Sequence, residues 1–166
     1  MKDYSSQLQQ IISKAAPILK ALNEDHFNLR SAPGKWSKKE ILGHLIDSAY
    51  NNHQRFIRAE KQGNLIFSGY DPEDWVIKNN YQQRGPVELV DTWVTTNKHL
   101  AILLAQLSAT AYEQQYTDHN FHQICMIHPA EEESTSLAYL AEDYIFHLEH
   151  HLAQLIEGYV KLAEEV

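Results

Sequence analysis

The residues of this chain best suited to chemistry are its histidines. There are ten of them in 166 residues, and His147 and His151 stand four residues apart. On a helix this spacing places two imidazoles one above the other on one face, where both can reach a single metal ion. Cys125 is the only cysteine, which excludes an internal disulfide and a multi-thiolate zinc site and leaves nitrogen and oxygen ligands. The pair therefore predicts part of a divalent-metal site.

The apolar pattern around this pair indicates which histidines face the core. His147 and His151 lie within or beside an apolar stripe at helical spacing, formed by Leu137, Leu140, Tyr144, Leu148, Leu155 and Tyr159. His150 falls on the polar side of the same helix, together with Asp143, Gln154 and Glu157. We therefore expect His150 to be a solvated surface residue and not a ligand.

A helical pair of ligands needs a third ligand from another element. His44 lies beside the apolar stripe of an earlier helix and begins a polar line that continues through Ser48, Asn51 and Arg55. Such a line along a buried edge is costly unless something satisfies it, and a metal ion with bound water would do so. We predict one divalent ion held by His44, His147 and His151. Asp47 is either an outer-shell partner that orients an imidazole or a plain surface carboxylate.

The alternative is that these histidines only pack and form hydrogen bonds, since a pair at this spacing is common by chance. The other histidines show no comparable geometry and are expected on the surface or in loops: His26, His53, His99, His119, His122 and His128. Cys125 could act as a nucleophile, although a lone cysteine is more often inert.

Hydrophobic periodicity predicts the elements that position the histidines. Four helices are expected, over residues 4–22, 37–59, 86–107 and from 135 or 136 to about 164, the last being the longest. The chain is then one all-α domain over residues 1–166. It forms a four-helix bundle with long connections after the second and third helices, so its topology need not be simple up-down-up-down.

Local signals mark the helix boundaries. Ser37 and Glu40 form a capping box at the start of the second helix, and Pro86 suits the first turn of the third. Residues 61–85 have the glycine and proline content of a long ordered connection. In the connection after the third helix, residues 121–127 are expected to form a short extended piece.

Composition narrows the class of protein. The formal charge is −8, from 14 basic and 22 acidic residues, and no run of lysine or arginine is suited to phosphates, so nucleic acid is not expected as a partner. No stretch approaches the 18 or so apolar residues of a membrane span, and the first residues do not resemble a secretion signal. We expect a cytoplasmic protein with no membrane partner.

Four motifs follow one another along the chain. The first is W-S-x-x-E-I-L-G-H-L-I-D-S with N-N-x-Q-R-F, over residues 36–56. It is followed by Y-D-x-x-x-W-V at 70–76, I-H-P at 127–129 and Y-x-x-H-x-x-H-H-L-x-Q-L at 144–155. In this order the motifs resemble the DinB-like family, particularly its YfiT-type subgroup. The resemblance spans about residues 29–155, and the histidines are its most specific part.

The resemblance implies a four-helix bundle with a three-histidine site for nickel or zinc at His44, His147 and His151, commonly in a homodimer. Members of the family are named as metal-dependent hydrolases, and relatives include thiol-dependent enzymes such as mycothiol-dependent maleylpyruvate isomerase and bacillithiol transferases. The sequence departs from the family pattern at 129–133, P-A-E-E-E, where His-Pro-Glu and a glycine turn are expected. The rim of the site is therefore expected to differ.

Three neutral imidazoles leave coordination positions open, as in catalytic metal sites. The ion can favour the thiolate form of a small thiol for transfer to a small-molecule substrate, or it can lower the pKa of a bound water for hydrolysis. We expect thiol transfer first, with a low-molecular-weight thiol as cosubstrate, and hydrolysis as the alternative. A non-catalytic metal-binding module is the third alternative.

Overall fold

Four long helices build the protein, as the periodicity predicted. The computed structural model describes residues 2–162, in which the long helices are α1 (Tyr4–Ala21), α3 (Lys38–Ala59), α5 (Pro86–Gln106) and α8 (Leu137–Leu155). The connections carry short helices, which are α2 (Glu24–Asn28), α4 (Pro72–Lys78), the 3-10 turn η1 (Tyr81–Gln83), α6 (Ala109–Glu113) and α7 (Phe121–Ile124). The described part of the chain contains isolated β-bridges but no strand.

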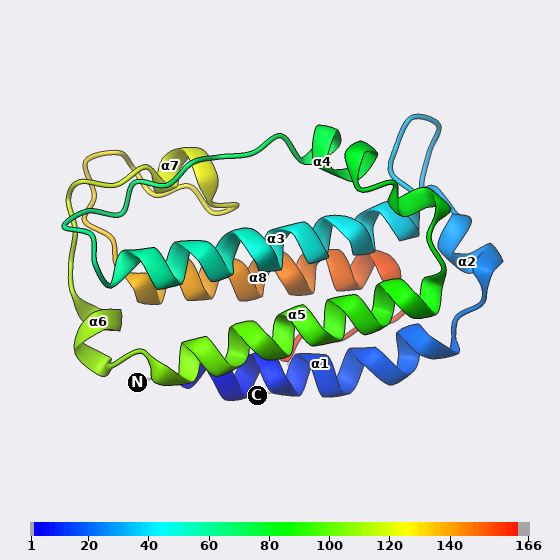
Figure 1. Cartoon of the computed structure of the whole chain (residues 1–166), viewed down its shortest axis with the longest axis horizontal. Helices are drawn as coiled ribbons and strands as arrows, with labels where there is room; N and C mark the ends of the chain where they lie inside the picture. Colours follow the sequence, from blue (N-terminus) through cyan, green and yellow to red (C-terminus); the bar gives the residue numbers. More distant parts are fainter. Residues whose placement is uncertain (1, 163–166) are drawn as a thin grey trace.

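The order of the helices in the bundle is not the order of the chain. α1 packs against α5 and α8, and α3 packs against the same two helices, so α1 and α3 lie on a diagonal. Figure 1 shows that α3 and α5 run in one direction while α1 and α8 run in the other. After α3 the chain therefore travels back along the bundle before α5 begins, which explains the length of that connection. This topology makes α3 and α8 antiparallel neighbours.

The starts of the long helices follow the predicted signals. The Ser37 side chain accepts a hydrogen bond from the Glu40 amide, and the Glu40 carboxylate accepts one from the Ser37 amide at 2.7 Å, which completes the capping box before α3. Pro86 occupies the first turn of α5. Ser136 caps α8 through the Tyr139 amide. These caps fix where the site-bearing helices α3 and α8 begin.

The predicted end of the last helix is wrong. α8 stops at Leu155, and its 19 residues make it shorter than the 22 residues of α3. Gly158 has a φ of +69°, a left-handed conformation that ends a helix, and the chain then turns back. The Leu162 amide at 2.8 Å and the Tyr159 hydroxyl at 3.3 Å both donate to the buried Glu149 carboxylate, so the returning chain satisfies this polar group in the bundle. The last predicted residues, 163 and 164, lie outside the described part.

The two long connections are joined to each other above the bundle. The Leu65 amide donates to the Asp118 carbonyl at 2.9 Å, and the Asn120 side chain pairs with both the amide and the carbonyl of Phe67. The expected extended piece at 121–127 is instead the single turn α7 followed by a bend, because the two buried side chains Phe121 and Cys125 are four residues apart, a spacing that places them on the same side of a helical turn. The connections therefore form an ordered cover over one side of α3 and α8.

The apolar stripes meet in one continuous core, whose largest fully buried side chains include Trp93, Phe27, Phe56 and Phe121. Among the described residues, none of the helices combines the length and the apolar content needed to cross a membrane. The core surrounds a more polar region between α3 and α8, which is where the histidines lie.

Gly43 allows the closest approach of a connection to α3. A Cβ atom at this position would lie 2.7 Å from Cε2 of the Tyr81 ring and would overlap the nearer ring atoms. Tyr81 is 2% exposed and its hydroxyl donates to Asp47 at 2.7 Å, so the ring cannot simply move aside. The glycine of this motif therefore has a packing role one residue before His44.

We predict that Gly43→Ala lowers the free energy of unfolding by about 2 kcal/mol, although the same change in an exposed helix usually raises it by about 1 kcal/mol. Urea unfolding of Gly43→Ala, Tyr81→Ala and the double variant measures the coupling. The Gly43→Ala penalty should vanish when Tyr81 is already alanine. An equal penalty in both backgrounds would mean that the Tyr81 ring is not its cause.

Candidate metal centre

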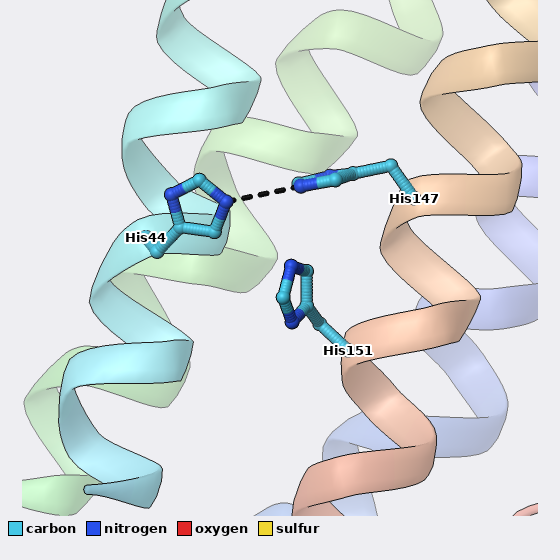
Figure 2. A group of neighbouring side chains, drawn as sticks. All are labelled: His44, His147 and His151. Atoms are coloured by element: carbon cyan, nitrogen blue, oxygen red, sulfur yellow. Dashed lines mark hydrogen bonds between the residues drawn. The ribbon is translucent and has the colours of Figure 1, made fainter. Parts of the chain in front are cut away.

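The structure brings the three predicted histidines together across the contact between α3 and α8. His44 projects from the second turn of α3, and His147 and His151 project from successive turns of α8 (Figure 2). Nε2 of His44 lies 3.0 Å from Nε2 of His147. One ring nitrogen from each residue falls in a group whose members all lie within 4.8 Å of one another. Among the described residues this is the only such group of three or more metal-ligating side chains.

A hydrogen bond orients the third imidazole. Nδ1 of His151 lies 2.9 Å from Oε1 of Gln154, and since a carbonyl oxygen only accepts, Nδ1 carries the proton. Nε2 of His151 is then unprotonated and points toward the other two rings (Figure 2). The amide nitrogen of Gln154 in turn donates to His150 at 3.1 Å. Gln154 therefore fixes the tautomer that a metal ligand requires.

The contact between His44 and His147 fits a shared cation. Two unprotonated nitrogens 3.0 Å apart repel each other, so either one of them is protonated or a cation lies between them. Two ligands on one ion at a bond length of about 2.1 Å are themselves roughly 3.0 to 3.4 Å apart. The Nδ1 atoms of both residues are buried without a protein partner, so a proton shared between the rings leaves the pair poorly satisfied. The donor set therefore suits a divalent ion with affinity for imidazole.

The surroundings keep the three imidazoles neutral. Burial and, to a smaller extent, the neighbouring His151 together lower the pKa of His44 to about 4. Burial and the adjacent histidines hold the pKa of His147 well below its usual range, and burial also lowers the pKa of His151. Neutral imidazoles have the free lone pairs that metal binding needs, so near neutral pH the site is ready to act as a ligand set.

Asp47 is buried between α3 and the connection that follows α4, so the interpretation as a plain surface carboxylate is wrong. It is 2% exposed, and its Oδ1 accepts hydrogen bonds from Tyr81 at 2.7 Å and Asn79 at 2.9 Å. Burial raises its pKa to about 6 despite these bonds. Asp47 makes no hydrogen bond to the three histidines in the described structure, so an outer-shell role for it stays a prediction.

Two hollows lie on either side of the histidines. The first, of about 390 Å³, is lined by His44 and His147 and is covered by both long connections through Tyr70 and Cys125, among others. The second, of about 740 Å³, is lined by His151 and includes Trp36. A site between these hollows can be reached by small molecules from two directions.

Asp143 is a candidate functional residue that the helical periodicity wrongly placed on the solvated side of the last helix. It is 7% exposed and lines the first hollow, where its carboxylate accepts from the Ile127 amide at 2.8 Å. Its position four residues before His147 was the available signal, because 143, 147 and 151 form one row along a helix. His119 was also misplaced, since it is buried at 6% exposure and contacts the Glu133 carbonyl.

Cys125 and the divergent segment 129–133 contribute less than the sequence allowed. Burial and the neighbouring Asp143 raise the pKa of the Cys125 thiol, so it is a poor nucleophile. Residues 129–133 supply no side chain to either hollow. Tyr70, which does line the first hollow, comes from a connection whose path follows from tertiary contacts and not from periodicity.

Comparison with known proteins places the fold and the site in a family. The profile of the DinB superfamily matches residues 7–155. The chain belongs to the DinB superfamily. This match covers both helices that carry the histidines and agrees with the resemblance drawn from the motifs.

Named relatives agree with this assignment. A protein of Oceanobacillus iheyensis named "Putative metal-dependent hydrolase" is 27% identical over 135 residues, which cover 81% of this chain and 71% of the relative. Its Bacillus subtilis counterpart of the same name, YfiT, is 23% identical over 90% of this chain and 79% of its own length. The solved structure of YfiT, described as a four-helix bundle of unusual topology, superposes with a TM-score of 0.73 over 92% of this chain and 81% of that chain.

A second solved structure, of the mycothiol-dependent maleylpyruvate isomerase, has a TM-score of 0.67 and 12% identity. The match covers 95% of this chain and 60% of the isomerase. At this identity the likeness shows a shared fold. This chain therefore shares its helical bundle with both solved structures.

We predict that the protein binds one divalent ion and that alanine at His44, His147 or His151 weakens binding at least about 100-fold. His150→Ala should retain the ion, because His150 adds no ligand atom to the group and meets it only through Gln154 and an edge contact with the His151 ring. Titration with zinc and nickel measures the affinity of each variant, and elemental analysis of the dialysed proteins measures the number of ions bound. Loss of the ion in His150→Ala with retention in His147→Ala would contradict the site.

We also predict that acid destabilises the metal-free protein through His44. Its folded pKa of about 4 lies below the unfolded value of 6.5, so the unfolded chain takes up the proton first as the pH falls. Between pH 7 and pH 4 this costs about 3 kcal/mol of unfolding free energy. Urea unfolding in chelator should show a shallower acid loss for His44→Gln, and parallel pH profiles would contradict the assignment.

Proposed function

We propose that the protein is a metal-dependent enzyme that transfers a small thiol to an electrophilic small molecule. The observation that carries this proposal is the pair of hollows on either side of the three histidines. A transfer joins two small molecules at one centre and needs two binding spaces, whereas hydrolysis needs one space and water. The names of the relatives support metal dependence and give hydrolysis as the reaction, whereas the mycothiol-dependent isomerase with the same fold supports the use of a thiol.

His44, His147 and His151 would hold the ion, which would supply Lewis acidity that favours the thiolate over the thiol near neutral pH. The thiol proton leaves to solvent. The sulfur then forms a bond to the electrophilic carbon, and the leaving group departs with its bonding electrons. This chemistry needs no protein base, which agrees with the positions of the nearby carboxylates. Asp47 does not line either hollow, and Asp143 is held by hydrogen bonds.

The helices keep the histidines in place for this reaction. Gln154 holds His151 in one tautomer, and Trp36 packs against His44 with ring centroids 5.1 Å apart. Because these contacts hold the imidazoles in fixed orientations, the histidines would not need to rearrange when the ion binds. The coordination positions that they leave open would then face the hollows.

Hydrolysis is the second candidate, and one observation favours it. Asp143 is the carboxylate that lines the first hollow, and burial raises its pKa, so it could accept a proton from water. In that case Asp143 would act as the general base for hydrolysis, and the second hollow would not be needed for a second substrate.

The zinc- or nickel-loaded protein, assayed with an aryl halide and a panel of small thiols and separately with an activated ester, distinguishes the two. We predict thiol-dependent halide release that the metal-free protein and His147→Ala lack, with Asp143→Asn keeping most of it. Ester turnover that needs the metal, proceeds without thiol and falls at least about 100-fold in Asp143→Asn or Asp47→Asn would establish hydrolysis instead. Metal binding without turnover in either assay would favour a binding module.

A further inference from the structure

A buried arginine shares the first hollow with the histidines. Arg55 lies on α3, three turns after His44, and lines the same cavity of about 390 Å³. Only 7% of the residue is exposed. Helical side chains lean toward the N-terminus of their helix, so the Arg55 side chain leans in the direction of His44. The guanidinium is therefore part of the wall that a bound molecule would meet.

Arg55 makes no ion pair within 4.0 Å in the described part of the protein. Its one hydrogen bond is a long contact of 3.5 Å from Nη1 to Oδ1 of Asn52, and its Nε is buried without a partner. Burial lowers the pKa of the guanidinium, but arginine stays protonated in proteins. A buried, unpaired positive charge is costly to the fold, so its presence in a cavity calls for an anion that binds there.

Asp143 faces the same hollow and interacts with the charge of Arg55 at longer range, but the two side chains do not form an ion pair. None of its oxygens lies within 4.0 Å of an Arg55 nitrogen. Its carboxylate is occupied by the Ile127 amide at 2.8 Å and by the Cys125 thiol. The amide nitrogen of Asn52 donates to the Ser48 carbonyl at 3.0 Å, so among these side chains the planar fork of Arg55 is the group that remains available for an anionic ligand.

We propose that Arg55 forms a carboxylate-binding subsite, and that the molecule entering the first hollow is a small organic acid. A guanidinium matches a carboxylate with two parallel hydrogen bonds. The single positive charge of Arg55 matches the single negative charge of a carboxylate, and no lysine or other arginine lines this hollow among the described residues.

The subsite also sets the shape of the ligand. His44 and His147 line the same hollow as Arg55, so a molecule held by its carboxylate presents its other end to the histidines. Short acids with a reacting group at the end opposite the carboxylate fit this arrangement. That the reacting group is a thiol rests on the proposed function, whereas the carboxylate contact does not.

Calorimetric titration of the zinc-loaded protein with three probes tests the subsite. The probes are 3-mercaptopropionate, 2-mercaptoethanol and succinate, which separate the carboxylate from the thiol. We expect 3-mercaptopropionate to bind about 10- to 100-fold more tightly than 2-mercaptoethanol, because a hydrogen-bonded charge pair is worth that much. Arg55→Gln should abolish the difference without changing 2-mercaptoethanol binding, and Arg55→Lys should keep part of it.

Arg58→Gln is the matched control, since Arg58 lies on the same helix but is exposed. It should keep the full preference for the carboxylate probe. Thermal unfolding supplies a second readout, because removal of an unpaired buried charge should leave the melting temperature of Arg55→Gln equal or higher. A lower melting temperature would indicate a structural ion pair and oppose the proposal.

The outcomes separate this proposal from the proposed function. If neither thiol binds but succinate binds and depends on Arg55, the carboxylate subsite stands and thiol transfer fails. If the wild-type protein shows no preference for 3-mercaptopropionate over 2-mercaptoethanol, or if Arg55→Gln keeps the preference, the subsite is wrong whatever the reaction is.

Discussion

The structure depends on three neutral imidazoles that meet where α3 packs against α8. Burial prevents their protonation near neutral pH, yet His44 and His147 approach within hydrogen-bond distance through atoms that both suit a metal. Something positive must lie among these lone pairs for the contact to be favourable. The antiparallel pairing of α3 and α8 exists in this bundle because the chain returns along its length after α3 (Figure 1). The unusual helix order is thus what brings the ligands together.

The connections turn this ligand set into a site that small molecules can enter. One side of the histidines is covered by two segments that are distant in sequence but are joined through Leu65, Phe67 and Asn120. These segments enclose a hollow whose walls carry Arg55 and Asp143, while the second hollow lies on the other side of His151. The connections therefore enclose the space beside the histidines, while the charged side chains that line it come from the bundle helices α3 and α8.

The sequence predicted the parts that follow from local periodicity. Helical spacing and the capping box predicted the long helices, and the four-residue spacing of His147 and His151 predicted two of the ligands. Asp143 was misplaced because the polar side of a helix faces a hollow here and not solvent. The end of α8 depended on the pairing of Glu149 with the returning chain, a tertiary contact that periodicity cannot contain. A homodimer and a cytoplasmic location stay predictions.

The central claim is that one ion binds to the three imidazoles, and anomalous scattering tests it most directly. A crystal of the zinc-loaded protein, measured at the zinc edge, should show one anomalous peak about 2.0 to 2.2 Å from Nε2 of His44, His147 and His151. The remaining positions on the ion should face the hollows. An anomalous peak at any other place, or a fully occupied ion that omits one of the three histidines, would contradict the account.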